Sequence, residues 1–420
     1  MAILRNILLM LLCGLHAPIL FAALSIEITE GTESALPVAV VPFAADGAPV
    51  DISAIVNADL QRTGYFKMLD QQAMPARPVT MQEVNFKDWQ AANQNYMVVG
   101  KVNGNGAQYD IQFQLLDVYK AGQLLGYRMT SSSNDLRRNA HHISDLIFEK
   151  LTGKKGAFSG RIAYITSSGG GHQLQVADAD GFNPQTVASS TEPLMSPSWS
   201  PDGKRIAYVS FERKSAAIYI QVLANGQRER VAEFPGINGA PAWSPDGTRL
   251  ALTLSKDGSP DIFVLNLVSR ALLKLTKGYS IDTEPSWSPD GRSIVFTSDK
   301  GGKPQLYLIP SQGGEEKRLT FSGAYNARGS FSPDGKYLAM VHGNGNDYRI
   351  GLMDMASRSI NVLTSGPDDE SPSFAPNGGM ILYASKKGST AFLSAVSIDG
   401  KMQQKLVFSS GEVREPAWSP

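Results

Sequence analysis

Two short groups of side chains in this 420-residue chain could bind a metal or carry acid-base chemistry. His141, Asp145 and Glu149 recur every four residues, which places them on one face of a helix. Such a face more often pairs with opposite charges or contacts solvent than holds a cation, and we favour that interpretation. Asp178-Ala179-Asp180-Gly181 resembles part of a calcium loop, but the later glutamate is missing. We therefore predict neither a metal nor another cofactor.

Motifs for covalent or nucleotide chemistry are absent from the sequence. It contains no Gly-x-Ser-x-Gly nucleophile elbow, no P-loop and no Gly-x-Gly-x-x-Gly pattern. No serine or histidine is spaced with a partner as a nucleophile and its base. We therefore predict a protein that is not an enzyme and has no catalytic residues.

A repeat of about 44 residues organises the larger part of the chain. Each copy joins an aromatic residue to a Ser-Pro-Asp-Gly turn, as in Trp199-Ser200-Pro201-Asp202-Gly203, and an alternating apolar run follows. The intervals between the aromatic residues are 44, 44, 44, 43 and 44 residues. These residues are Trp199, Trp243, Trp287, Phe331, Phe374 and Trp418. Four short strands in this length are typical of a β-propeller blade, with the aromatic side chains packed between blades.

The two ends of the repeat region predict how the propeller closes. The strand that follows the turn first appears at Arg161 to Ile165, without an aromatic strand before it. The aromatic strand last appears at Trp418, with no turn strand after it. We therefore predict a six-bladed propeller over residues 160–420, in which the C-terminal strand completes the first blade and removes exposed sheet edges.

The first 22 residues have the pattern of a secretory signal peptide. Arg5 precedes an apolar run, and cleavage is expected after Ala22 or Ala23. A retained membrane anchor is the alternative, although the run is short for a bilayer span and Pro18 interrupts it. The only cysteine, Cys13, lies in this segment, which fits export to an oxidising periplasm.

The charge balance limits the possible partners. The chain has 39 Lys and Arg against 39 Asp and Glu, so it lacks the basic excess of proteins that bind nucleic acid or anionic membranes. No later stretch is apolar enough to cross a bilayer. We expect a monomer that binds other proteins.

A small α/β domain precedes the propeller and covers residues 35–152. The expected elements are buried strands at 36–43 and 96–99, a helix around 52–60, a hairpin over 108–129 and a helix over 136–152. Ser133 or Asn134 should cap the last helix, and Gly153 should end it. Residues 23–34 form an N-terminal segment before this domain, and residues 153–159 form a short linker to the propeller.

The axial mouth of the propeller is the predicted binding surface. Residues just before each aromatic strand converge there, and together they could bind a polar peptide or loop. A second interpretation is that they only cap strand ends, and a third is that the crowded acids hold a cation in the channel. The candidate residues are Met195, Ile237, Asn238, Ala240, Asp282, Thr283, Glu284, Arg328, Asp369, Glu370 and Arg414.

The whole chain resembles the TolB family of the Tol-Pal envelope system, in its export signal, its small α/β domain and its six repeats. Outside the repeat, the resemblance is carried by Val40-Val41-Pro42-Phe43, Phe148-Glu149-Lys150-Leu151-Thr152-Gly153 and Asn238-Gly239-Ala240-Pro241. Departures from the family pattern are Phe331, Phe374, Gly329 and Asn377, and they affect only the regularity of single blades.

The resemblance implies a periplasmic scaffold without catalysis. Family members bind the lipoprotein Pal at the propeller mouth and TolA through the N-terminal segment, and they support outer-membrane constriction during division. Bacteriocins use the same mouth in some bacteria. Carried over by position, Ile237, Ala240, Thr283 and Glu284 face Pal, while Leu24, Ile26 and Ile28 contact TolA. The alternatives are an exported hydrolase or lyase that uses channel acids such as Asp282 or Asp369, and a propeller that binds a small ligand.

Overall fold

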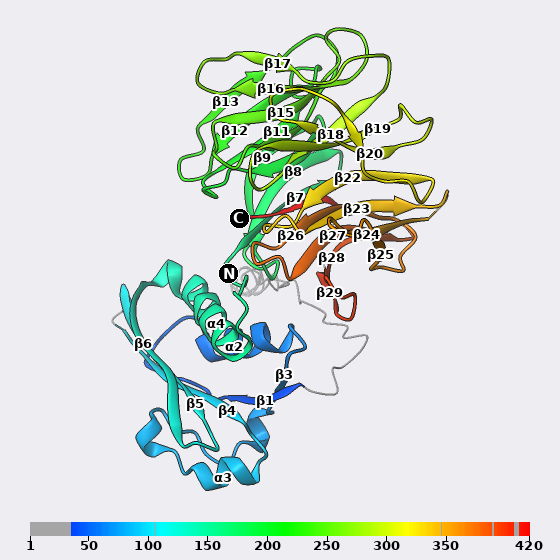
Figure 1. The fold of residues 1–420 in the computed structure, drawn as a ribbon. Coiled ribbons are helices and arrows are strands. Elements are labelled where there is room, and N and C mark those ends of the chain that lie inside the picture. The colour runs from blue at the N-terminus through cyan, green and yellow to red at the C-terminus, as the bar shows by residue number, and fades with distance from the viewer. Residues whose placement is uncertain (1–34, 105, 346, 389, 407–410) are drawn as a thin grey trace, which may run out of the picture.

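The computed structural model describes residues 35–104, 106–345, 347–388, 390–406 and 411–420. The predicted signal peptide and the N-terminal segment lie outside these ranges. Among the helices of the described ranges, none has the length and hydropathy needed to cross a membrane. Figure 1 shows a small domain of helices and sheet below a larger ring of sheets.

The N-terminal domain is one mixed sheet with helices on both faces. Its strand order is β3-β1-β4-β5-β6, and β2 also pairs with β4. Helices α2 and α4 cover one face and α3 lies at the other (Figure 1). The elements are β1 (Leu36–Val40), β2 (Ala44–Ala45), α2 (Ile52–Gln61), β3 (Phe66–Met68), α3 (Phe86–Ala91), β4 (Tyr96–Gly104), β5 (Gln108–Asp117), β6 (Gly122–Ser132) and α4 (Leu136–Thr152), with short 3-10 turns at Gln71–Ala73, Met81–Glu83 and Ser133–Asp135.

Local chemistry explains the ends of the two long helices. Asp51 caps α2 by accepting a hydrogen bond from the backbone N–H of Ala54 at 3.0 Å. Gly153 ends α4 in the left-handed conformation, with φ 71°, as predicted. The predicted cap at Ser133 or Asn134 is wrong, because these residues belong to a 3-10 turn. Asp135 takes the cap position without a side-chain bond.

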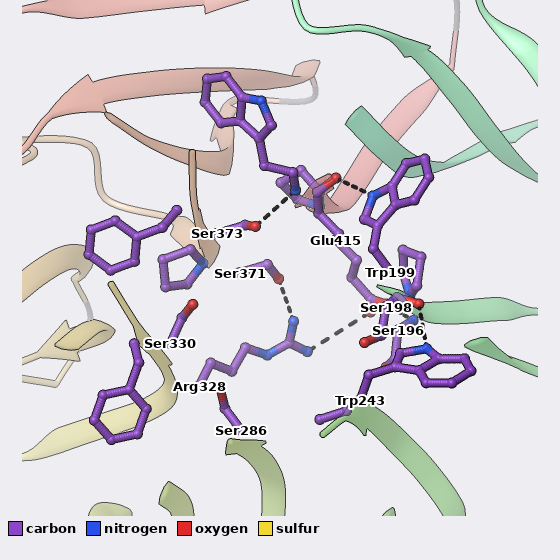
Figure 2. A pocket seen from close by; sticks show the side chains of 18 of the residues that line it. Ser196, Ser198, Trp199, Trp243, Ser286, Arg328, Ser330, Ser371, Ser373 and Glu415 are labelled. Carbon is purple, nitrogen blue, oxygen red and sulfur yellow. Dashed lines mark hydrogen bonds and ion pairs between the residues drawn. The ribbon is translucent and has the colours of Figure 1, made fainter. Parts of the chain in front are cut away.

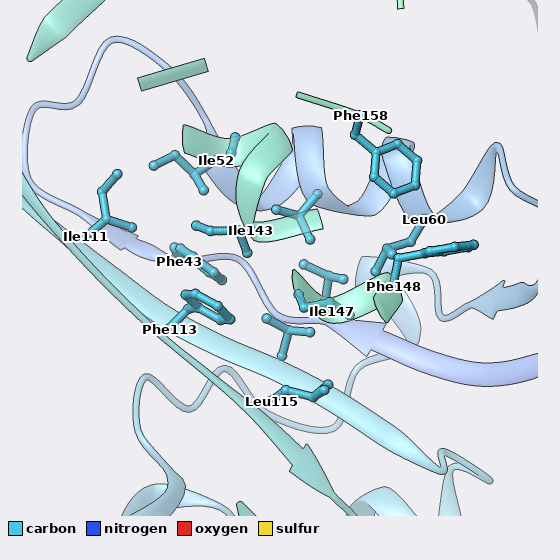
Figure 3. Packing of buried hydrophobic residues seen from close by; sticks show 14 of the residues in the cluster. Phe43, Ile52, Leu60, Ile111, Phe113, Leu115, Ile143, Ile147, Phe148 and Phe158 are labelled. Atoms are coloured by element: carbon cyan, nitrogen blue, oxygen red, sulfur yellow. The ribbon is translucent and has the colours of Figure 1, made fainter. Parts of the chain in front are cut away.

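The core of this domain lies between the sheet and helices α2 and α4 (Figure 3). Ile52, Leu60 and Ile143 point from the helices toward Phe113 and Leu115 of strand β5. The helical spacing of the apolar residues in α2 and α4 therefore gives each helix one buried face, as the sequence predicts. On the other face of the sheet, Trp89 of α3 is fully buried.

The rest of the chain forms six four-stranded antiparallel sheets around one axis, within the described residues. The first is β30 (Glu412–Trp418), β7 (Arg161–Ser168), β8 (Gly171–Asp178) and β9 (Gln185–Ser190). The others are β10 (Leu194–Trp199), β11 (Arg205–Ser210), β12 (Ala217–Val222) and β13 (Arg228–Ala232); β14 (Asn238–Trp243), β15 (Arg249–Leu254), β16 (Asp261–Asn266) and β17 (Leu272–Lys274); β18 (Asp282–Trp287), β19 (Ser293–Ser298), β20 (Gln305–Pro310) and β21 (Lys317–Arg318); β22 (Tyr325–Phe331), β23 (Tyr337–Gly343), β24 (Tyr348–Asp354) and β25 (Ile360–Val362); and β26 (Asp369–Phe374), β27 (Met380–Lys387), β28 (Thr390–Ser397) and β29 (Gln403–Leu406).

The predicted closure of the ring by the C-terminal strand is confirmed. Strand β30 pairs with β7 antiparallel, with Trp418 opposite Ile162 and Val413 opposite Thr166. Figure 1 shows the red C-terminal strand beside the green strands of the first blade. The last residues of the chain therefore supply the innermost strand of that blade.

The repeated aromatic residues join neighbouring blades. The indole N–H of Trp243 donates to the backbone oxygen of Ser198 in the preceding blade at 3.2 Å, and Trp199 and Trp287 make the same kind of bond. An arginine from the preceding blade stacks on each ring, as Arg205 does on Trp243 at 4.6 Å. The structure confirms the predicted packing role, whereas the arginine partners were not predicted.

Candidate protein-binding site

Each innermost strand contains a bulge at the same place. The register with the second strand shifts there in all six described blades. The residue at the bulge has a positive φ between 45° and 57°, although it is never glycine. Such a conformation is costly for these residues and persists where the surrounding structure imposes it. The six bulge residues are Ser196, Ala240, Glu284, Arg328, Ser371 and Glu415, and all of them line the axial channel.

A proline follows five of these bulges, and Gly329 follows the sixth. Proline has no backbone N–H and is tolerated in a sheet where the hydrogen-bond ladder is already broken. The repeated Pro residue before each aromatic strand is therefore explained by the bulge. The channel itself is a cavity of about 570 Å³ lined largely by small residues such as Ser198, Ser286 and Ser373.

Arg328 extends across the channel toward Ser371 and Glu415 (Figure 2), and with its bond to Glu284 it joins the bulges of four blades. Its Nε donates to Oε1 of Glu284 at 2.7 Å, and its guanidinium also contacts Ser371 and lies 3.9 Å from Oε1 of Glu415. Glu415 in turn accepts the backbone N–H of Ser196. Burial alone would lower the pKa of Arg328, but the nearby glutamates outweigh it and raise that pKa. Arg328 is therefore a fixed positive charge within an acidic ring.

Three of the predicted binding residues are buried. Asn238, Asp282 and Asp369 are each the first residue of an innermost strand, and at most 1% of each is exposed. Asn238 bonds both the N–H and the backbone oxygen of Phe234, and Asp369 accepts a bond from Ser385 at 2.6 Å. These side chains therefore lie inside the folded propeller, and their contact with a partner stays a prediction. They hold the preceding loop in place, as the second interpretation of the sequence proposed.

Three of the other predicted residues line the channel. Ala240, Glu284 and Arg328 occupy bulge positions and line the channel, while Met195, Thr283, Glu370 and Arg414 come one residue before a bulge. Glu370 is exposed, and Arg414 donates to Ser167 at 3.0 Å. Ile237 precedes strand β14 and is 48% exposed. The three apolar candidates of the N-terminal segment, Leu24, Ile26 and Ile28, lie outside the described residues.

Sequence reasoning missed three exposed apolar residues near this rim. Ile281 is 52% exposed and occupies the place in its blade that Ile237 has in the preceding one. Tyr279 and Phe321 extend from the loops before the next innermost strands and are more exposed still. The signal for Ile281 was its interval of 44 residues from Ile237. Large apolar side chains that gather on one rim are typical of a protein-binding surface.

The two groups considered for metal chemistry have other partners. His141 is buried, with its Nδ1 2.7 Å from Oδ2 of Asp59, whereas Glu149 on the same helix face is exposed, as predicted for a solvated face. Asp145 accepts the backbone N–H of Phe158 at 2.7 Å and fastens the linker. Asp178 and Asp180 both pair with Arg137 of α4. Among the described residues, Asp59, His141 and Asp180 come close enough to share an ion, but Arg137 already supplies a positive charge there.

Comparison with known proteins gives the family. A model of the TolB beta propeller domain matches residues 148–420, and one of the TolB amino-terminal domain matches residues 24–124. The Tol-Pal system protein TolB of Methylococcus capsulatus is 63% identical over 404 residues, 95% of each chain. That of Thioalkalivibrio sulfidiphilus is 61% identical over 409 residues, 95% of this chain and 94% of the relative.

A solved structure agrees over almost the same length. The crystal structure of TolB from Acinetobacter baumannii is 42% identical, with a TM-score of 0.88, over 95% of this chain and all of that one. The predicted order of a small α/β domain and a six-bladed propeller is therefore confirmed, and family membership supports the prediction of a protein without catalysis. The chain belongs to the TolB family of Tol-Pal system proteins.

Proposed function

We propose that this propeller scaffold acts in the periplasm, binds the lipoprotein Pal at the propeller mouth, and contacts TolA through residues 23–34 and the N-terminal domain. Through these contacts it supports outer-membrane integrity and constriction during cell division. The protein is exported with a cleaved signal peptide and works as a monomer. Bacteriocins compete for the same mouth where they use this protein.

The observation that supports a Pal site at the mouth is the exposed rim. Ile237, Ile281 and Phe321 present apolar surface to solvent beside the charged ring of Glu284 and Arg328. Protein interfaces commonly combine apolar anchors with charged groups that set specificity. Within the described residues, the linker contacts the propeller beyond the far end of strand β26, through Asn377, and not at the mouth.

The buried acids argue against catalysis in the channel. The hydrolase or lyase hypothesis assigned the chemistry to Asp282 and Asp369. The structure encloses both carboxylates, so a substrate in the channel does not reach them. Binding of another protein at the rim requires no such access.

Titration calorimetry with the purified soluble domain of Pal tests the mouth. We expect the double variant Ile237→Asp/Ile281→Asp to bind Pal at least about tenfold more weakly, because both changes place charge in an apolar contact. The control is Val268→Asp, which changes an apolar side chain that is 86% exposed in the turn between β16 and β17. Unchanged affinity in the double variant, or an equal loss in the control, would contradict the proposal. A pulldown from envelope extract with Ala240 and Thr283 both substituted gives a second test, in which only the native protein should recover Pal.

The N-terminal segment should couple the two partners. We propose that residues 24–34 either dock on the body of the protein or bind TolA, and that Pal shifts this balance. Thermodynamic linkage then requires each partner to change the affinity of the other by the same factor. Pal affinity measured with and without residues 24–34 tests the coupling, and equal values would reject it without affecting the proposed mouth.

A further inference from the structure

A cluster of buried and half-buried ionisable side chains joins the two domains between helix α4 and the first blade. His141 of α4 is 1% exposed, and its Nδ1 lies 2.7 Å from Oδ2 of Asp59 in α2. The other oxygen of Asp59 lies 3.0 Å from Arg62. Asp59 therefore orients the imidazole from within the N-terminal domain and directs its other nitrogen toward the propeller.

That other nitrogen, Nε2 of His141, has no hydrogen-bond partner. It faces two carboxylates of the first blade, at 4.0 Å from Asp178 and 3.9 Å from Asp180. Both carboxylates also bind Arg137, whose guanidinium stacks on Phe182 at 3.9 Å. Because Arg137 already lies against both oxygens, the cluster is better described as an ionic clamp than as a metal site.

The charges of the clamp do not balance while the imidazole is neutral. Three carboxylates, Asp59, Asp178 and Asp180, stand against the guanidinium groups of Arg62 and Arg137, which leaves one negative charge. Uncompensated charge is costly in a buried site. A proton on Nε2 of the imidazole would remove this charge and turn an unpaired acceptor into a donor aimed at two carboxylates.

The surroundings of the two blade carboxylates differ. Burial raises the pKa of Asp178. Burial alone would also raise the pKa of Asp180, but Arg62, Arg137 and His141 outweigh it and lower that pKa. Arg161, which also lies in the field of Asp178, donates to the backbone oxygen of Gly203 at 2.6 Å instead. Nε2 of the imidazole is the atom of the clamp that lacks a partner while it faces both carboxylates.

We propose that His141 is a proton-operated link between the domains. With Nε2 protonated, helix α4 is fastened to the turn that contains Asp178 and Asp180. Loss of the proton leaves Nε2 facing two carboxylates without a donor, and it loosens the N-terminal domain from the propeller. Histidine is suited to this role because it exchanges its proton in the physiological pH range.

The remainder of the junction is thin enough for this link to matter. A cavity of about 700 Å³ separates the two domains beside the clamp and is lined by residues of both. Among the described residues, Gln404 donates across the junction to the backbone oxygen of Arg62 at 2.6 Å, and Asn377 donates to that of Lys155 in the linker at 2.8 Å. The clamp therefore supplies polar contacts between the described parts of the two domains in addition to the bond from Gln404.

Fluorescence energy transfer within the full chain tests the link. Dyes on Tyr119→Cys and Val268→Cys, both exposed and on different domains, report domain separation, and Cys13→Ser removes the natural thiol. We expect the ratio of fastened to loosened molecules to be about tenfold higher near pH 5.5 than near pH 8, the effect of one hydrogen bond between charged groups. A ratio that does not change with pH would overturn the proposal.

Two variants identify the histidine responsible. His141→Gln keeps a polar side chain that does not titrate, so the pH dependence should disappear. His142→Gln changes the exposed neighbour on the same helix and should retain it. If His141→Gln fails to fold, nuclear magnetic resonance of the native chain replaces it. Nε2 of His141 should gain its proton over the same pH interval in which the energy transfer changes. A ring that does not titrate in that interval would overturn the link. Neither measurement depends on Pal or TolA.

Discussion

Removal of the C-terminal strand is the most direct test of how the propeller is held together. Deleting residues 412–420 takes β30 from the first blade and leaves β7 as an unpaired inner edge. The strand contributes five paired positions, a valine that is 1% exposed and the indole of Trp418. Burial of the two side chains and the ladder hydrogen bonds together amount to about 7–15 kcal/mol.

That loss is comparable to the whole stability of a domain, about 5–15 kcal/mol, so the truncated propeller should not fold cooperatively. Thermal unfolding followed by circular dichroism measures it. A matched pair of point variants separates strand loss from a general effect: Val413→Asp changes a buried residue of β30, and Val362→Asp changes a 47% exposed residue of the outer strand β25. The first should lower the melting temperature strongly and the second hardly at all. An unchanged midpoint in the truncated chain would refute closure by this strand.

Three further predictions concern single side chains. Arg328→Met should lower the free energy of unfolding in urea by about 1–3 kcal/mol, because Glu284 and Glu415 lose the cation that they share. Equal stability would show that the channel residues do not depend on Arg328. Burial raises the pKa of Asp369, so the folded chain binds that proton more tightly than the unfolded chain and loses stability as the pH rises toward the folded-state pKa. The stability of Asp369→Asn should therefore increase relative to that of the native protein between about pH 4 and 7. A difference in melting temperature that stays constant with pH would contradict this. Asp145→Ala removes the acceptor of the Phe158 and Ser159 amides, so both should exchange hydrogen about tenfold faster or more, and unchanged protection would exclude this role.

The larger features of the fold could be predicted because they repeat locally. The Ser-Pro-Asp-Gly turn depends on bonds within a few residues, as when Ser200 donates to Asp202 and accepts the N–H of Arg205. The regular interval between aromatic residues then sets the number of blades, and the unpaired strands at each end require closure. Helices α2 and α4 of the first domain were equally predictable from their apolar spacing, whereas the short helix α3 (Phe86–Ala91) was not predicted.

The individual site residues were harder to predict because a strand pattern does not show a bulge. Glu284 and Arg328 turn into the channel since the bulge reverses the local alternation of side chains. Asp282 and Asp369, which were predicted for the same rim, come before the bulge in their strands, and their side chains are buried in the propeller. The exposed Tyr279 and Phe321 sit in loops whose direction no periodicity indicates.

The sequence by itself determined the division into two domains, the six blades and the family, since each depends on short motifs or on their spacing. Only the tertiary structure decided which polar residues are accessible and which of them meet. His141 and Asp59 are 82 positions apart, and the two blade carboxylates that His141 faces belong to another domain. The physical reason is that burial and charge pairing are set by surfaces brought together in space, whereas a motif records only its neighbours along the chain.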